Sequence, residues 1–338
     1  FFILRRAVNG SVTWYKRVYS SFTGASVTRF FVQNEKIYVL LALGQGVNRA
    51  GYNYLKLDTT VLFSSLPTQT TYRVLLVIQP NGISKMIPLD DNLPSGRVAD
   101  IDIYPNGDIA AVTGQASTGM QLGSLQYPNN IGFFFLRLDS TGSIKQALKV
   151  YRASALPGSA LPLQMNSVRI NRSDTTLFVG GLYAMNIGQP DHQYLIHNGA
   201  SVVDTITTKN YFPTSNAQIR YALFLKTDLL TSNWESVLGP GIGANGSECI
   251  AQVGTNMYYT FSKGQVGPMV VNGQVIDADT VRMSGLISFN SAGDIRGVKL
   301  WKDAQANPTF MPMRLKTIGT HLYVSGDLDR PLLFDTIS

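Results

Sequence analysis

One sequence module recurs five times along the 338 residues of the chain, and this repetition constrains the fold more than any other feature. The module has an aromatic-rich strand, a turn that usually contains glycine, a second strand that often carries Trp or Tyr, a spacer, and two further strands. In the third copy these segments are residues 133–139, Thr141-Gly142, 144–151, 167–170 and 177–181. The turn glycines Gly10 and Gly293 lie four modules apart, which gives about 71 residues per module and therefore close to five modules.

The repeated unit of four short strands predicts an all-β fold, a five-bladed β-propeller of four-stranded antiparallel blades. No segment shows the 3.6-residue apolar period and caps of a long helix. Only 14% of the residues are charged and 44% are hydrophobic, as expected when most sheets are covered on both faces. A pair of β-sandwiches is the competing fold, but it predicts no regular module and a boundary richer in Pro, Ser or charge.

The phase of the modules predicts how the ring closes. Strands such as residues 98–104 and 109–114 look like an inner pair, and the aromatic strand with its successor looks like the outer pair. On this phase the chain begins with an outer pair, residues 1–19, and ends with an inner pair, residues 313–326. We therefore expect one domain over 1–338 with blades near 20–95, 96–160, 161–240 and 241–305, and a composite blade from 306–338 plus 1–19, which leaves no open sheet edge.

Two segments carry an additional hairpin signal. Residues 194–203 and 269–276 both place Asn-Gly between apolar runs, which is the strongest short-range indication of a β-hairpin. We expect these two hairpins to project from the disc.

The module resembles the bacterial SBBP-type β-propeller repeat. The resemblance rests on the aromatic strand and turn at 133–142, on the paired strands at 101–114, and on His321-Leu-Tyr-Val-Ser-Gly326. It implies the propeller fold and an exported, surface-attached or extracellular protein, and it implies no catalytic residue. The fourth module departs from the pattern, because its turn near Leu230-Thr231 lacks glycine and its inner strand begins with Glu248.

The formal net charge of +7 and the pI of about 9.4 favour anionic partners. The nearest approach to a basic cluster is Arg5, Arg6, Lys16 and Arg17, which fits either a solvated strand edge or a binding surface. Its residues do not alternate with aromatic residues in the manner of an RNA-binding protein, so we expect no nucleic acid. No apolar run approaches the length of a membrane-spanning helix, and the start without Met indicates a processed protein or a segment of a longer one.

The single cysteine and three histidines predict no metal site and no cofactor. Cys249 lies in an apolar segment and is expected to be buried and inert. Together with His192, His197 and His321 it does not form a metal-binding pattern. We interpret His192 and His197 as surface residues near the first hairpin.

Carboxylates and tryptophans are the remaining candidates for chemistry. Five-bladed glycosidases place carboxylates around the channel mouth, and the candidates here are Asp102, Glu248 and Asp327. Asp100 shares a strand face with Asp102, but no pairing between blades is evident. Trp14, Trp234 and Trp301 fall on the second strand of their modules at equivalent positions, which fits packing between blades or one aromatic platform per blade of a lectin.

These observations predict a non-enzymatic structural or interaction module of an extracellular, cell-surface or virion assembly, without catalytic residues. Its expected partner is a protein in a larger surface or filamentous assembly, with acidic glycans as a second class. The alternative is a glycan-binding propeller that uses Trp14, Trp234 and Trp301 with the basic residues Arg5, Arg6, Lys16 and Arg17. The second alternative is a glycoside hydrolase.

Overall fold

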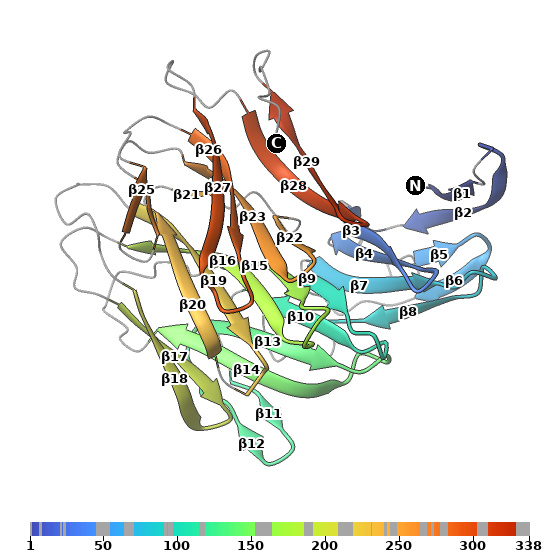
Figure 1. Cartoon of the computed structure of the whole chain (residues 1–338). Helices are drawn as coiled ribbons and strands as arrows, with labels where there is room; N and C mark the ends of the chain where they lie inside the picture. The colour runs from blue at the N-terminus through green and yellow to red at the C-terminus, as the bar shows by residue number, and fades with distance from the viewer. Residues whose placement is uncertain are drawn as a thin grey trace. The chain divides into compact units, whose positions relative to one another are not determined.

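The computed structural model in Figure 1 is built from β-strands joined by turns and loops. It describes residues 2–6, 9–20, 22, 25–44, 55–63, 71–90, 93, 97–114, 119–152, 164–185, 192–208, 219–230, 232–239, 242–243, 249–263, 269–271, 274–277, 283–302 and 310–328. Within these residues every ladder is antiparallel and there is no α-helix, which confirms the predicted all-β class. Accordingly, no described helix has the length and apolar character needed to cross a membrane.

The chain divides into two compact units. Unit 1 comprises residues 1–93 with 140–142, and unit 2 comprises residues 94–139 with 143–338. The strands of unit 1 are β1 (Phe2–Arg6), β2 (Val12–Ser20), β3 (Ser26–Gln33), β4 (Lys36–Gly44), β5 (Leu55–Leu57), β6 (Thr60–Phe63), β7 (Thr71–Ile78) and β8 (Ser84–Pro88). They form two four-stranded sheets, β1-β2-β5-β6 and β3-β4-β7-β8.

Unit 2 contains three larger sheets and two separate pairs. The first large sheet has the order β9-β10-β13-β14-β17-β18, from the strands Val98–Ile103, Ile109–Thr113, Gly132–Leu138, Ile144–Arg152, His192–Asn198 and Ser201–Thr208. The second has the order β15-β16-β19-β20-β24-β25, from Gln164–Ile170, Leu177–Met185, Ile219–Thr227, Ser232–Gly239, Met269–Val271 and Gln274–Asp277.

The third large sheet joins β23 (Asn256–Lys263) to β26 (Met283–Phe289) and β27 (Ile295–Lys302), with β21 (Ile242–Gly243) and β22 (Ile250–Val253) both paired to β23. The two separate pairs are β11 (Gln121–Leu122) with β12 (Leu125–Gln126), and β28 (Phe310–Ile318) with β29 (His321–Leu328).

Four sheets have the four-strand order of the predicted blades. They are β3-β4-β7-β8, β9-β10-β13-β14, β15-β16-β19-β20 and β22-β23-β26-β27. In each, a hairpin of two strands pairs through its second strand with a second hairpin. Each sheet therefore joins the last two strands of one sequence module to the first two strands of the next, through antiparallel pairing.

Both predicted hairpins form, and each extends a sheet. β17 pairs with β14, so β17 and β18 are the fifth and sixth strands of the sheet that begins with β9, and β24 pairs with β20 in the same way. The third such hairpin, β5 and β6, pairs with β2 and was not expected from the sequence. The blade limits at 161 and 241 assign the first two hairpins to the blade that follows, whereas their hydrogen bonds join them to the sheet before.

The sheet containing β16 and β19 is covered on both faces, which explains the low charge of the chain. One face contributes Val179 and Leu225 to a core with Val112 and Phe135 of the β9–β14 sheet. The other face contributes Phe178 and Phe224 to a second core with Met257, Tyr259, Phe289 and their neighbours. A strand buried on both sides has few positions for charged residues.

In unit 2 the first strands of successive sheets contact one another. β9 and β10 contact β15, β15 contacts β22, and β22 contacts β28. Strands at the same position of successive modules therefore lie side by side, as the innermost strands of neighbouring blades do in a propeller.

The turns between the third and fourth strands explain both the repeated glycine and its one exception. Gly10, Gly82, Gly142 and Gly293 all have φ between 81° and 95°, where a side chain is disfavoured. The corresponding turn between β19 and β20 is one residue shorter than the turn between β13 and β14, and Leu229 takes the positive φ there. The buried side chain of Leu229 packs in the core, so packing compensates for the backbone conformation.

No described strand closes the sheets into a ring. β28 and β29 pair only with each other, and β1 pairs only with β2, among the residues that the structure describes. The composite blade predicted from residues 306–338 plus 1–19 therefore stays a prediction. The C-terminal tail, residues 330–338, lies outside the described part.

Candidate functional site

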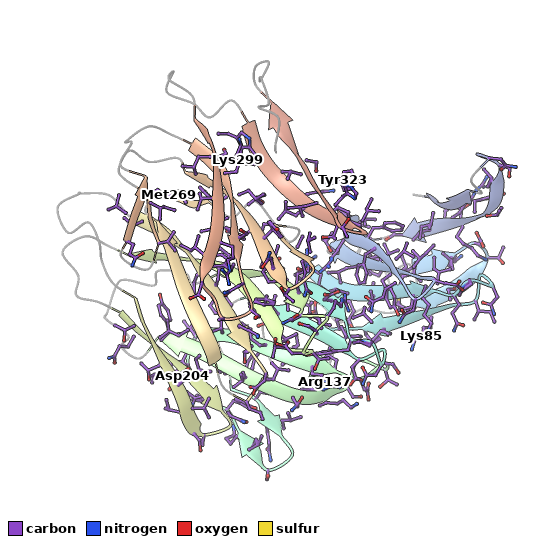
Figure 2. The ribbon with its side chains drawn as sticks, viewed as in Figure 1. Lys85, Arg137, Asp204, Met269, Lys299 and Tyr323 are labelled. Atoms are coloured by element: carbon purple, nitrogen blue, oxygen red, sulfur yellow. The ribbon has the colours of Figure 1, made fainter. Side chains whose placement is uncertain are left out.

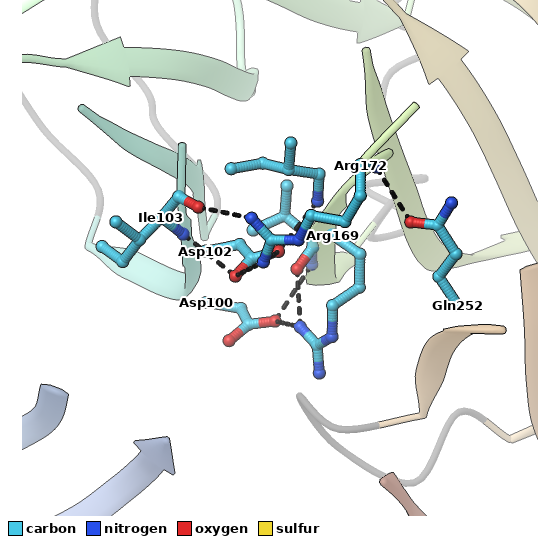
Figure 3. Close-up of polar contacts among 8 residues, drawn as sticks. Asp100, Asp102, Ile103, Arg169, Arg172 and Gln252 are labelled. Atoms are coloured by element: carbon cyan, nitrogen blue, oxygen red, sulfur yellow. Dashed lines mark hydrogen bonds and ion pairs between the residues drawn. The ribbon is translucent and has the colours of Figure 1, made fainter. Parts of the chain in front are cut away.

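Asp100 and Asp102 of β9 reach across to β15, the first strand of the next sheet (Figure 3). Asp100 Oδ2 accepts hydrogen bonds from the backbone N–H of Val168 at 3.0 Å and from Arg169 Nη1 at 2.7 Å. Asp102 Oδ2 accepts one from the N–H of Ile170 at 2.9 Å. Because β15 pairs with β16 on one side only, these carboxylates satisfy backbone donors on its other edge.

The polar contacts continue from β15 to the next two sheets. Arg172 donates to the Ile103 carbonyl at 2.7 Å and to Asp102, and its own N–H donates to Gln252 Oε1 at 3.0 Å. Thr317 of β28 donates through Oγ1 to the Gln252 carbonyl at 2.8 Å. One series of side chains thus joins β9, β15, β22 and β28 within unit 2.

This environment makes the β9 carboxylates structural. Asp100 and Asp102 are 0% and 3% exposed, and Arg169, which faces Asp100, is 9% exposed. Burial alone would lower the pKa of Arg169, but the attraction of Asp100 and Asp102 outweighs it and raises that pKa. The prediction that Asp100 and Asp102 share a face is confirmed, but Asp102 is not exposed at a channel mouth. Glu248 and the side chain of Asp327, the other glycosidase candidates, lie outside the described residues.

A second repeated contact explains the basic residue near the end of the aromatic strand. Asp108 Oδ2 lies 2.8 Å from Arg137 Nη2 and 3.1 Å from Lys145 Nζ. In the next module Asp174 Oδ2 lies 2.8 Å from Lys226 Nζ. In both cases an aspartate from the turn between the first two strands of a sheet binds a basic residue on the third strand, so these charges hold strands of one sheet together; Arg137 is labelled in Figure 2.

The two histidine interpretations have different outcomes. His197 is 5% exposed, so the expectation of a surface residue was wrong; its Nε2 lies 2.9 Å from Tyr151 Oη. It faces Lys149 across the β14–β17 ladder, and Lys149 Nζ donates to the Pro128 carbonyl at 2.7 Å. Burial lowers the pKa of Lys149 to about 8 and also lowers that of His197. The side chain of His192 lies outside the described residues.

The burial of Lys149 could hardly be predicted from the sequence. Lys149 occupies the same strand face as Ala147 and Tyr151, both buried. The segment that covers this face, around Tyr127 and the β11–β12 hairpin, has no strong periodic pattern. Tyr127 Oη donates to the Ala147 carbonyl at 2.6 Å and its ring lies edge-on to Phe134.

Two of the three tryptophans are equivalent. Trp14 lies opposite Arg5, and Trp234 opposite Lys226, each directly after the bulge that follows the turn. Trp301 lies opposite Ser284, at the far end of its ladder. In that ladder the position equivalent to Trp14 and Trp234, directly after the bulge, is held by Gly297. The predicted equivalence of Trp301 was therefore wrong. Trp301 is half-buried, and the side chains of Trp14 and Trp234 lie outside the described part.

The two N-terminal basic residues with described side chains, Lys16 and Arg17, do not share a surface. Lys16 and Arg17 are neighbours on β2, so their side chains point to opposite faces. Lys16 Nζ lies 3.0 Å from Asp58 Oδ2, and Asp58 Oδ1 accepts the Arg17 N–H at 2.9 Å. Asp58 lies in the β5–β6 turn, so Lys16 fastens that hairpin to β2. Arg5 and Arg6 belong to β1, but their side chains are outside the described residues.

The side chain of Arg17 belongs instead to an exposed surface, which we call the β2 face and define as Tyr15, Arg17, Tyr19, Lys56 and Val61. Tyr15, Arg17 and Tyr19 alternate along β2, Tyr19 pairs with Lys56, and Lys56 pairs with Val61. Tyr15 and Tyr19 are 53% and 45% exposed. Arg17 lies between them, with Nη1 3.3 Å from Tyr19 Oη and the guanidinium carbon 5.9 Å from the Tyr15 ring centre.

The other face of the same strands is buried. Val18, Leu55 and Leu57 belong to the core of unit 1, together with Ile3 and residues of β4 and β7. The alternation on β2 and β5 therefore separates a packed face from a face with two exposed phenol rings and two cations. The hydrogen bond to Tyr19 raises the pKa of Arg17, so Arg17 is charged at any physiological pH.

Cys249 is fully buried, and burial raises the pKa of its thiol to about 12, which confirms the predicted inert environment. The described residues include no group of three His, Cys, Asp or Glu side chains placed to hold a metal ion.

Comparison with known proteins adds no assignment. No protein-family model matches the chain, and no curated protein is significantly similar to it in sequence.

Proposed function

We propose that the chain is a five-bladed β-propeller that serves as a non-enzymatic interaction module of an extracellular, cell-surface or virion assembly, with a protein of that assembly as its partner. The observation that carries this proposal is how the charged residues are used. The carboxylates of β9 join neighbouring sheets, whereas the β2 face leaves aromatic and cationic groups exposed. A surface of this kind suits binding, and the resemblance to SBBP-type repeats points to the same exported setting.

The strand order of the sheets supports the composite blade. The sheets of β9–β18 and β15–β25 each contain two hairpins followed by an added hairpin. The β1-β2-β5-β6 sheet matches the last four strands of this order, and the β28-β29 pair matches the first two. We therefore propose that β29 pairs with β1.

The complete sheets also predict the register of this pairing. In the β22–β27 sheet, Met257 is in the second pair from its turn and lies opposite Phe289, which directly follows the bulge in β26. Leu322 is likewise in the second pair from its turn, and Arg6 is at the corresponding bulge. By this correspondence Leu322 is opposite Arg6, and Val324 is opposite Leu4.

A disulfide tests the proposed closure. In the full chain, Leu4→Cys with Val324→Cys should form a cross-link under mild oxidation, because directly opposed residues bring their Cβ atoms within reach. The matched control, Leu4→Cys with Tyr323→Cys, places the two thiols on opposite faces and should cross-link far less. Equal cross-linking in both variants, or none in either, would contradict the register.

The state of the native protein tests the proposed role. Under native extraction from its source, the chain should elute in an assembly much larger than its 37.0 kDa mass. Recovery only as a free monomer would contradict the role as an interaction module of an assembly.

Glycan binding is the second candidate function, and the observation that favours it is the β2 face. Among the residues singled out in the sequence, Arg17 is the described side chain on this face; Trp301 does not hold the strand position that Trp14 and Trp234 share. The buried and bonded state of Asp102 does not favour the glycoside hydrolase.

A further inference from the structure

The hairpins added to three of the sheets follow one pattern. Along the chain, each added hairpin comes after the two strands that open a sheet, and it pairs back to the second strand of the hairpin before those two strands. The hairpins β5–β6, β17–β18 and β24–β25 thus pair with β2, β14 and β20, as Figure 1 shows for β17 beside β14. In every case the first strand of the hairpin makes the pairing, so an outer strand gains a neighbour on its free edge.

The three pairings also share a register. Each outer strand has a residue beside the bulge that follows its turn, and a pair with the added hairpin lies six residues further along the strand. The bulge residues are Val12, Ile144 and Ser232, and the pairs are Val18–Leu57, Val150–Ile196 and Leu238–Val271. We call the residue six places after the bulge residue the docking position. At each docking position an aliphatic residue of the hairpin lies opposite an aliphatic residue of the outer strand.

Strand β27 has a docking position but no added hairpin among the described residues. Its bulge residue is Ile295, so its docking position is Trp301, and no described strand pairs with its outer edge. The pattern places its hairpin in the connection that follows β28 and β29. In the proposed composite blade the next strand is β1, at the other end of the sequence, so no such connection exists here.

The other outer strand without an added hairpin, β8, is different. It begins its pairing at Ser84 and ends at Pro88, before the sixth residue, so it has no docking position. Proline also has no N–H to donate to a further strand. β27 is therefore the described outer strand that has the docking position and lacks its hairpin.

We propose that the outer edge of β27, at Trp301 and Lys302, binds an extended strand of the protein partner, with an aliphatic residue of that strand opposite Trp301. This inference rests on the proposed function and names the surface at which the partner binds. Strand addition gives affinity through main-chain hydrogen bonds, and the alternate side chains give specificity. The fourth strand of a blade lies at the rim of a propeller, so closure of the ring leaves this edge accessible.

Hydrogen exchange on the full chain tests the edge. The amides of residues 298–302 should exchange at least about tenfold more slowly in the native assembly than in the isolated chain, because a docked strand takes up outward N–H groups. In the isolated chain they should exchange faster than those of residues 235–239 on β20, whose docking position is paired. Equal protection in an isolated monomer would mean that the chain itself covers the edge, and protection only in a homodimer would assign it to a second copy. Either result overturns the inference.

A variant locates the pairing at the docking position. Trp301→Asp should lower the share of the chain found in the native assembly by about tenfold or more, because an acidic side chain replaces the apolar contact. The matched control is Val298→Asp, which makes the same change in charge three residues earlier on β27 and should assemble normally. Equal losses for the two variants would overturn the docking position. The exchange measurement needs no substitution, so it decides the question even if Trp301→Asp does not fold.

The two proposals fail in different ways. Recovery of the chain only as a monomer would contradict the proposed interaction module, and this inference with it. A native assembly in which residues 298–302 are no better protected than in the isolated chain would overturn the β27 edge alone and leave the module standing.

Discussion

Strands β9 and β2 both place charged side chains at alternate positions, yet their surroundings give these charges opposite roles. On β9, Asp100 and Asp102 face the edge of β15 opposite β16, and backbone N–H groups of β15 donate hydrogen bonds to the two carboxylates. On β2, Arg17 faces away from the core of unit 1 and is exposed between two tyrosines. The role of a charged residue on a strand therefore depends on what packs against its side of the strand, since the alternating pattern is the same in both cases.

The largest expected effect is at the buried end of this comparison. Asp100→Ala leaves Arg169 buried without its carboxylate and leaves the Val168 N–H without its side-chain acceptor. We expect a loss of about 3–5 kcal/mol in the free energy of unfolding, measured by urea denaturation. A loss below about 1 kcal/mol would contradict the structural role of β9.

A smaller loss is expected at the neighbouring carboxylate. Asp102→Asn keeps the shape but removes the charge that Arg172 binds, and the Arg172 side chain is 44% exposed. Because solvent compensates the exposed guanidinium, the expected loss is about 1–2 kcal/mol in the same measurement. Equal losses in the free energy of unfolding for Asp102→Asn and Asp100→Ala would contradict the argument that the exposure of the arginine partner determines the loss.

An intermediate case is His197, a basic group on a covered face. Its pKa in the folded protein is lowered below 6.5 by burial, with the charge of Lys149 acting in the same direction. The unfolded chain therefore takes up the proton first, and stability should fall as the pH drops below about 6.5. Thermal unfolding should show a smaller loss between pH 7 and pH 5 for His197→Gln than for the unsubstituted chain. Identical losses for the two proteins would contradict the burial argument.

The smallest effect on stability is expected on β2. Arg17→Gln should leave the free energy of unfolding unchanged within the error of urea denaturation, since the side chain is exposed. A loss as large as that of Asp102→Asn would show that Arg17 supports the fold, and would remove the contrast between the two strands.

Much of the fold could be predicted because it is encoded locally. The turn glycines, the Asn-Gly hairpins and the strand lengths depend on neighbouring residues, and the four-strand order of the modules follows from them. The edge to which the added hairpins pair is a long-range choice. Residues 192–208 follow β16 in the sequence but pair with β14, and no local signal distinguishes the two.

The candidate site was only partly predictable for the same reason. That Asp100 and Asp102 share a face follows from strand alternation, but their partners Arg169 and Arg172 come from another module. The basic residues were identified as a cluster by proximity in sequence, and alternation then separated Lys16 from Arg17. Tyr15 and Tyr19 are ordinary strand residues by pattern, and only the packing of Val18, Leu55 and Leu57 on the opposite face shows that they are exposed.

The fully buried Cys249 gives the chain a built-in reporter of opening. A thiol with a pKa of about 12 is almost entirely protonated at neutral pH, and alkylating reagents need both access and the thiolate. Its rate of labelling should therefore measure how often the core around β22 and β23 opens. The rate at which the core of unit 2 opens can be measured in this way without introducing another cysteine, even inside a native assembly.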